Sequence, residues 1–172
     1  YLNFNNCDAS GDVDGWNVGL NGLWKGNSGV YLNGVLAYSH DSDSLTRDDG
    51  IGTNKSDFNG HSISAQLELG KKFDKGKNVN FTPYLSLLGL KYDRDSVSEH
   101  GSGAGLNVGD ASNNYFTSNL GVRVGKDILN DDGSKRGGVM LGVSWQHQFS
   151  DVDFPVTAAL QNAAPGSSFT VQ

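Results

Sequence analysis

The chain is poor in cysteine, in proline and in charge. It holds one cysteine, Cys7, and three prolines among its 172 residues. A single cysteine excludes an intrachain disulfide framework and a zinc site built from cysteines. Charged residues make up 19% of the chain, and the net charge is −6. Lysine and arginine do not cluster anywhere, so nucleic acid is not an expected partner, because binding it normally requires a concentrated positive patch.

Long hydrophobic runs are also missing. A membrane-spanning helix needs about 20 consecutive apolar residues, and no run in the sequence approaches that length. This excludes a helical span but leaves membrane-spanning strands open, because such strands need only about 9–11 residues. The first residues lack the charged and apolar regions of a signal peptide, so we expect the sequence to be a mature or trimmed piece.

Glycine, by contrast, is abundant. The chain has 24 glycines, and hydrophobic residues make up 36% of it. A β-barrel with a polar interior and a lipid-facing exterior has this profile, because half of each strand is polar but uncharged. A glycine-rich secreted β-sandwich that acts as an adhesive binding module has the same profile. Composition leaves both classes open.

Apolar and polar residues alternate along much of the chain, with the period of two that indicates strands. The predicted strands are Val13–Trp24, Val30–Ser39, Asn59–Phe73, Val79–Asp93, Tyr115–Lys126 and Val139–Phe149. In the fourth of these, Pro83 lacks an amide donor, which indicates the start of a strand or a bulge. Further on, Val156–Leu160 is either a strand or a short helical turn, and Ser167–Gln172 is expected to start another strand.

The connections between these strands alternate in length. Short glycine-containing turns alternate with two longer polar stretches, residues 40–57 and 94–114, which we interpret as loops. Outer-membrane barrels have short turns on the periplasmic side and long loops outside, so this alternation places both loops at the cell surface. The predicted fold class is all-β, an antiparallel up-and-down transmembrane β-barrel.

Several of these strands resemble one family. The segments are GWNVGLNGLWKGNSGVYLNGVLAYS (15–39), SISAQLELGKKF (62–73), NVNFTPYLSLLGLKYD (78–93), NYFTSNLGVRVG (114–125), VSWQHQFSD (143–151) and APGSSFTV (164–171). In this order they resemble strands of the autotransporter β-domain, the barrel translocator of type V secretion. The resemblance implies about six to eight strands of a barrel of about twelve. We therefore expect residues 1–172 to be one domain, the central portion of such a barrel.

The resemblance also implies a function and partners. An autotransporter β-domain anchors in the outer membrane and helps to move an N-terminal passenger to the cell surface. The implied partners are the lipid of the outer membrane, the protein's own passenger segment and the barrel assembly machinery. No cofactor and no metal is implied, and the chain is not expected to be an enzyme.

Polar residues on one side of the predicted strands should line the barrel lumen. Glu68 and Arg123 match lumen-facing residues of the family, and we expect them to pair there. A structural ion pair and a role along the transport path both remain open. The other residues predicted to line the transport path are Asn17, Asn21, Ser62, Ser64, Gln66, Thr117, Asn119, Ser144, Gln146 and Gln148.

Aromatic residues on the other side should face lipid or lie at its interfaces, where barrels carry aromatic girdles. They are Trp16, Trp24, Tyr38, Phe73, Phe116, Trp145 and Phe149. If the chain were instead a soluble sandwich, the same residues would form its hydrophobic core. That second hypothesis predicts that Trp16, Trp24 and Trp145 are sealed between two stacked sheets.

A third hypothesis is an outer-membrane barrel enzyme. The run His40-Asp41-Ser42-Asp43 resembles the Asp/His sites of outer-membrane proteases, but a second acidic and histidine pair is not visible. The aspartates of residues 41–49 lack the spacing of an EF-hand loop, so a solvated surface loop is the simpler interpretation.

Overall fold

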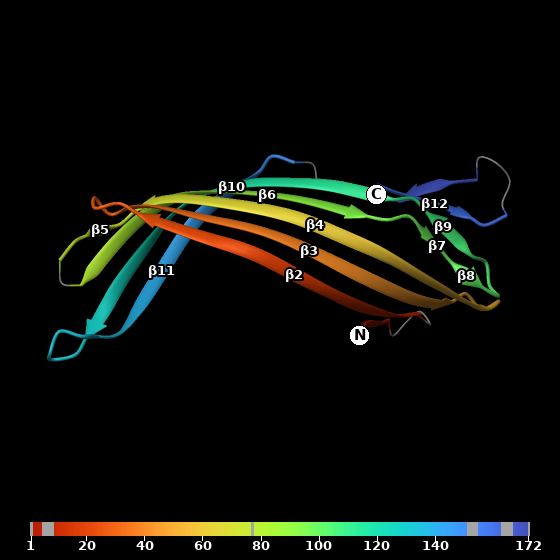
Figure 1. Ribbon diagram of the computed structural model, residues 1–172, viewed down its shortest axis with the longest axis horizontal. Coiled ribbons are helices and arrows are strands. Elements are labelled where there is room, and N and C mark those ends of the chain that lie inside the picture. Colours follow the sequence, from red (N-terminus) through yellow and green to blue (C-terminus); the bar gives the residue numbers. More distant parts are fainter. Residues whose placement is uncertain (1, 5–8, 77, 151–154, 163–166, 172) are drawn as a thin grey trace.

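Six long strands lie side by side in one curved antiparallel sheet (Figure 1). This computed structural model describes residues 2–4, 9–76, 78–150, 155–162 and 167–171. The long strands are β2 (Ala9–Lys25), β3 (Val30–Asp48), β4 (Thr53–Lys71), β6 (Val79–Arg94), β10 (Ala111–Leu129) and β11 (Lys135–Gln148). They follow one another in sequence order across the sheet, as in an up-and-down barrel wall. The predicted all-β antiparallel fold is confirmed.

Shorter strands complete the architecture. In the main sheet, β1 (Leu2–Phe4) pairs with β2, β5 (Phe73–Asp74) with β6, and β8 (His100–Gly101) with β4. A second, small sheet has the order β13-β12-β9-β7. Its strands are β7 (Val97–Ser98), β9 (Leu106–Val108), β12 (Val156–Leu160) and β13 (Phe169–Val171). Residues 156–160 are thus a strand, while Gln172 lies outside the described residues.

The two ends of the main sheet differ. At one end, here called the turn end, tight turns join β2 to β3 and β10 to β11 (Figure 1). In the first of these turns Gly29 has a φ of +81°, a conformation that favours glycine. At the opposite end, the loop end, β7, β8, β9 and β12 gather beside the ends of β3 and β4 (Figure 1). Among the described residues no helix has the length and hydropathy to cross a membrane, a finding that leaves strands untested.

The structure corrects the predicted loop at residues 40–57. Strands β3 and β4 continue through this stretch in unbroken register, from His40 opposite His61 to Asp48 opposite Thr53. Only residues 49–52 turn. Beyond His40 both faces of the hairpin are mainly polar, with Leu45 and Phe58 as the apolar exceptions, so the alternation of apolar and polar residues disappears although the backbone ladder persists. Side chains also bond across it: the Ser44 hydroxyl donates to Asp57 at 2.6 Å.

The second predicted loop, residues 94–114, is also partly ordered. It contains β7, β8 and β9, and β10 already begins at Ala111. Pro83 lies inside β6, opposite Val122 of β10. The pairing of β4 with β6 ends one residue away, at Gly70 opposite Tyr84. The missing amide donor of Pro83 thus coincides with the end of one ladder.

The register divides the main sheet into two faces of opposite character. On the convex face, Leu69 of β4 and Leu85 of β6 are register partners, and they are 51% and 43% exposed. On the concave face, Glu68 pairs in register with Ser86, and these residues are 9% and 2% exposed. The main sheet therefore buries polar residues on its concave side and leaves apolar residues uncovered on its convex side.

This arrangement is not a soluble sandwich. Trp16, Trp24 and Trp145 are 56%, 60% and 63% exposed. They lie on the convex face of a single layer rather than between two stacked sheets. Among the described residues, the buried hydrophobic ones are Val97 and Ala158, which belong to the small sheet at the loop end.

Candidate functional site

Three side chains from three strands meet on the concave face. Tyr31 is on β3, Glu68 on β4 and Arg123 on β10. Strand β6 lies between β4 and β10, so the Arg123 side chain crosses β6 to reach Glu68. Such a contact between non-adjacent strands is favoured on the inner side of a curved sheet, because side chains converge there. The alternation of the sequence is what directs all three side chains to this side.

The geometry is that of a bidentate ion pair. The two terminal nitrogens of Arg123 donate to the two carboxylate oxygens of Glu68 at 2.8 and 2.7 Å. The Tyr31 hydroxyl donates to the same carboxylate at 2.8 Å. The side chain of Glu68 is only 12% exposed, and that of Arg123 is 30% exposed. Charge-assisted bidentate pairs of this kind are among the strongest polar contacts in proteins.

Two tyrosines and two glycines shape the surroundings of this pair. The Arg123 guanidinium lies over the Tyr84 ring, 3.7 Å from its centroid. Gly121 leaves room for Tyr84, because a Cβ at position 121 would lie 2.7 Å from that ring. Gly70 does the same for the Tyr31 ring. The sequence analysis did not identify either tyrosine as part of the site. The signal it could have used is a glycine directly opposite an inward tyrosine.

The other residues predicted for the lumen all lie on the concave face by register, but they do not form one cluster. They are Asn17, Asn21, Ser62, Ser64, Gln66, Thr117, Asn119, Ser144, Gln146 and Gln148. Some bond to neighbours on the same face: Gln66 donates to Ser86 at 3.1 Å and Asn21 to Asn33 at 2.8 Å. The face offers many hydrogen-bonding groups spread over a wide area.

An open hollow of about 390 Å³ lies beside the ion pair on this face. Its lining includes Asn21, Lys25, Asn33, Glu68 and Arg123. These side chains present donors and acceptors without an enclosed cavity. The hollow therefore suits transient contact with a polar chain better than tight binding of a small molecule.

The predicted aromatic residues lie on the convex face. Trp16 and Tyr38 pack together with ring centroids 5.5 Å apart, as do Phe116 and Phe149 at 5.4 Å. Nearer the turn end, the Lys71 ammonium lies 5.0 Å from the centroid of the Phe73 ring. The remaining two, Trp24 and Trp145, are exposed on the same face.

Comparison with known proteins decides the family. The Autotransporter beta-domain family matches residues 2–172, which is almost the whole chain. The chain belongs to the autotransporter β-domain family. It is also similar to the autotransporter adhesin/invasin TibA of Escherichia coli O78:H11 (strain H10407 / ETEC), with 25% identity over 142 residues. That match covers 81% of this chain but only 14% of the relative. The β-domain is a bacterial outer-membrane component.

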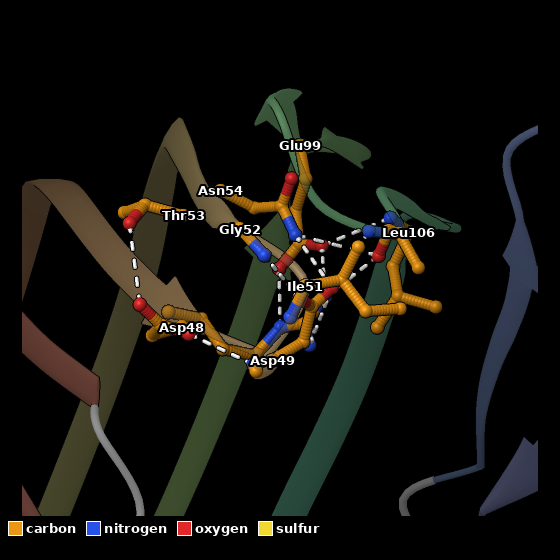
Figure 2. A network of polar contacts seen from close by, with 11 residues as sticks. Asp48, Asp49, Ile51, Gly52, Thr53, Asn54, Glu99 and Leu106 are labelled. Carbon is orange, nitrogen blue, oxygen red and sulfur yellow. Dashed lines mark hydrogen bonds and ion pairs between the residues drawn. The ribbon is translucent and has the colours of Figure 1, made fainter.

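A second polar cluster of the β-domain lies at the loop end (Figure 2). Arg47 donates to both carboxylate oxygens of Glu99, at 3.0 and 2.6 Å. Glu99 also accepts the backbone amide of Leu106 at 2.9 Å. The Arg47 hydrogen bond holds the pKa of the Glu99 carboxyl below its usual value. Sequence analysis missed this cluster, because Arg47 lies 52 residues before Glu99 in the chain.

Asp49 anchors the other half of the cluster. Its carboxylate accepts the amides of Gly52 and Ile51 within the β3–β4 turn, at 2.9 and 3.0 Å. It also accepts the amide of Ala104 at 2.6 Å. The hydrogen bond from Gly52, followed by that from Ile51, lowers the pKa of the Asp49 carboxyl. Asp49 thereby joins the hairpin tip to the segment that follows β8.

The β-domain does not bring together the residues of the enzyme hypothesis. His40 and Asp41 are neighbours in β3, so their side chains leave opposite faces of the strand. His40 lies on the convex face, with its ring centroid 6.1 Å from that of Trp16. Asp41 lies on the concave face against Gly60. In the described part of the chain no group of three or more His, Cys, Asp or Glu side chains is arranged to hold a metal ion.

Proposed function

We propose that residues 1–172 form part of the wall of a translocator barrel that anchors an autotransporter in the outer membrane and gives passage to its N-terminal passenger. The observation that carries this proposal is the opposite character of the two faces. Apolar side chains on the convex face suit lipid tails, whereas the polar concave face suits a hydrated passage.

The concave polar residues form the transport path in this proposal. Neutral amides and hydroxyls such as those of Asn21, Gln66 and Asn119 offer hydrogen bonds to an extended chain at many points. The Glu68–Arg123 pair holds β4 and β10 at a fixed separation and so maintains the width of the passage. The aromatic residues of the convex face lie in lipid or at its interfaces.

The orientation follows from the two ends of the sheet. The loop end, with the small sheet and the β3–β4 tip, lies at the cell surface, and the turn end lies in the periplasm. The convex face of β2 supports this placement: its apolar stretch from Trp16 to Trp24 has about the length of a membrane-spanning strand. Toward the loop end the same face continues with Asp14 and Asp12. The barrel assembly machinery inserts the domain.

Crosslinking tests the passage directly. In the full protein with Cys7→Ser, single cysteines replace Asn21 on the concave face or Leu20 on the convex face. A passenger stalled during export, and carrying its own cysteine, is expected to form a disulfide with position 21 and not with position 20. Equal crosslinking at both positions, or crosslinking at position 20 alone, would reject the proposal.

A further inference from the structure

The segment after β6 runs along the edge of β4 at the loop end, and its backbone at Ala104 contacts side chains of the concave face. Arg47 and Asn54 are register partners in β3 and β4, and both side chains point to that face. The carbonyl of Ala104 accepts hydrogen bonds from Arg47 at 3.0 Å and from Asn54 at 3.4 Å. The backbone at Ala104 therefore lies on top of these side chains, and Asn54 is only 1% exposed.

We call residues 97–108, which contain β7, β8 and β9, the strap. On one side it is tied to the sheet, because β8 pairs with β4 through Gly101 opposite Asn54. On the other side Gln161, which follows β12, donates from its side chain to the carbonyl of Glu99 at 2.6 Å and from its backbone amide to Gly105 at 2.8 Å. The strap thus bridges from β4 to the chain that follows β11.

The bridge passes the loop end of the strands in between. In the main sheet β4 and β11 are separated by β6 and β10. The end of β6 also contacts the segment between β9 and β10, because the Arg94 side chain donates a hydrogen bond to the carbonyl of Gly109 at 2.6 Å. Figure 1 shows the short strands gathered at this end of the arch.

The contacts that hold the strap to the hairpin tip are mainly polar (Figure 2). They centre on the Glu99 carboxylate, held by Arg47, and on the Asp49 carboxylate, which accepts Ala104. Two side-chain atoms of β4 in this region, Asn54 Oδ1 and Ser56 Oγ, are buried without a hydrogen-bond partner in the protein. Regions held in this way open more readily than long ladders do.

We propose that the strap closes the exit of the passage and that the passenger displaces it by breaking the contacts of Glu99 and Asp49. This inference rests on the proposed passage along the concave face. The closed strap would prevent leakage through the barrel when no passenger is in transit. The small sheet moves with the strap, since β7 and β9 belong to both.

A reversible lock tests the strap. Lys55 of β4 and His100 of the strap are register partners, and Cβ atoms directly opposite each other in an antiparallel pair lie about 4.5–5.5 Å apart. In the Cys7→Ser background, Lys55→Cys with His100→Cys is therefore placed to form a disulfide between β4 and the strap. We expect passenger display on cells to fall at least tenfold while the disulfide is formed, and to recover on reduction. Each single cysteine variant is the control and should display the passenger normally.

A second variant loosens the strap instead. Glu99→Gln keeps the shape of the side chain but removes its charge, and we expect a rise of at least threefold in the conductance of the full protein in planar bilayers. Lys55→Gln, at the position of β4 that pairs with His100, removes a nearby charge that takes no part in the contacts of Glu99 and Asp49, and it should leave conductance unchanged. Normal display by the oxidised double-cysteine protein, or unchanged conductance of Glu99→Gln, overturns the strap proposal.

The two proposals fail in different ways. If the stalled passenger crosslinks to position 21 while the locked strap has no effect, the passage stands and the strap proposal alone is wrong. If no crosslink to position 21 forms, the passage itself is wrong. Folding of every variant is checked by its shift on unheated detergent gels, which folded barrels show.

Discussion

At the scale of single residues, the concave face depends on one charged pair. Glu68 is a buried acidic residue of the main sheet, and three donors from Arg123 and Tyr31 satisfy its carboxylate. Removing one partner of such a pair costs more than the pair itself contributes, because the other charge then lies uncompensated. The pair is therefore a sensitive position whether it is purely structural or also part of the passage.

Arg123→Leu is expected to lower the free energy of unfolding by about 1.5–3 kcal/mol, the range for hydrogen bonds to charged groups. Urea unfolding of the barrel in lipid vesicles measures this change. Glu68→Gln alone and the double variant Arg123→Leu/Glu68→Gln complete the cycle, and the double variant should lose less than the sum of the two single losses. Additive losses would show that the two side chains do not interact.

Glu99 gives the strap a pH dependence. Its pKa is lower in the folded protein, chiefly through Arg47, so its stabilisation is fully present above the unfolded value of about 4.3. That stabilisation is lost as the pH falls through the lower folded pKa. The pKa of Asp49 is lowered as well, so its stabilisation is fully present above its unfolded pKa of about 3.9 and is lost at lower pH. Hydrogen exchange at residues 97–108, corrected for intrinsic rates, should therefore quicken below about pH 4. Glu99→Gln should exchange fast at neutral pH also, and equal protection of the unaltered protein at both pH values would contradict the account.

The alternation of the sequence assigns single residues to one face of a strand, but it does not show which residues meet across strands. Glu68 and Arg123 each lie on the polar side of an alternating strand, and this places both on the same face of the sheet, because successive side chains of a strand alternate. The parts played by Tyr31 and Tyr84 depend on which strands are neighbours and by how much they are offset. Those offsets are set by the whole sheet, so the sequence of one strand does not contain them.

At the scale of elements, the main finding is that β3 and β4 extend far beyond the apolar stretch. Each has 19 residues, whereas a membrane strand needs about 9–11. Sequence periodicity marks a strand only where its two faces meet different surroundings. Beyond His40 both faces are mainly polar, so the signal ends while the hydrogen-bonded ladder continues. The same reasoning explains why β10 begins at Ala111, before its alternation becomes visible.

The extended hairpin predicts a pattern of hydrogen exchange. Amides in residues 41–47, and those in residues 54–60 that donate to β3, should be protected nearly as well as those in residues 32–38, because the same β3–β4 ladder runs through all of them. Exchange measured on the refolded barrel by mass spectrometry provides the test. The turn at residues 49–52 is the internal control and should exchange faster. Rapid exchange throughout residues 41–60 would restore the loop that the sequence predicts.

At the scale of the whole molecule, the sheet separates two environments. Its convex face carries large apolar residues that remain exposed, such as Leu20 and Leu141, each 74% exposed. Its concave face carries the polar residues and the ion pair. Fold class and family were within reach of the sequence, because composition, strand period and motif order are properties of the whole chain. The strap and the small sheet were not, because they are made by short strands whose pairing is non-local.

Spin labels placed one at a time along β4 test this separation most directly. In the Cys7→Ser background of the full protein in lipid vesicles, labels at positions 62 to 69 are measured for collision with oxygen, which enriches in lipid, and with a water-soluble nickel complex. The account predicts that oxygen dominates at 63, 65, 67 and 69, and that at 62, 64, 66 and 68 the nickel complex dominates or both are excluded. A flat profile, or oxygen maxima at the even positions, would contradict it.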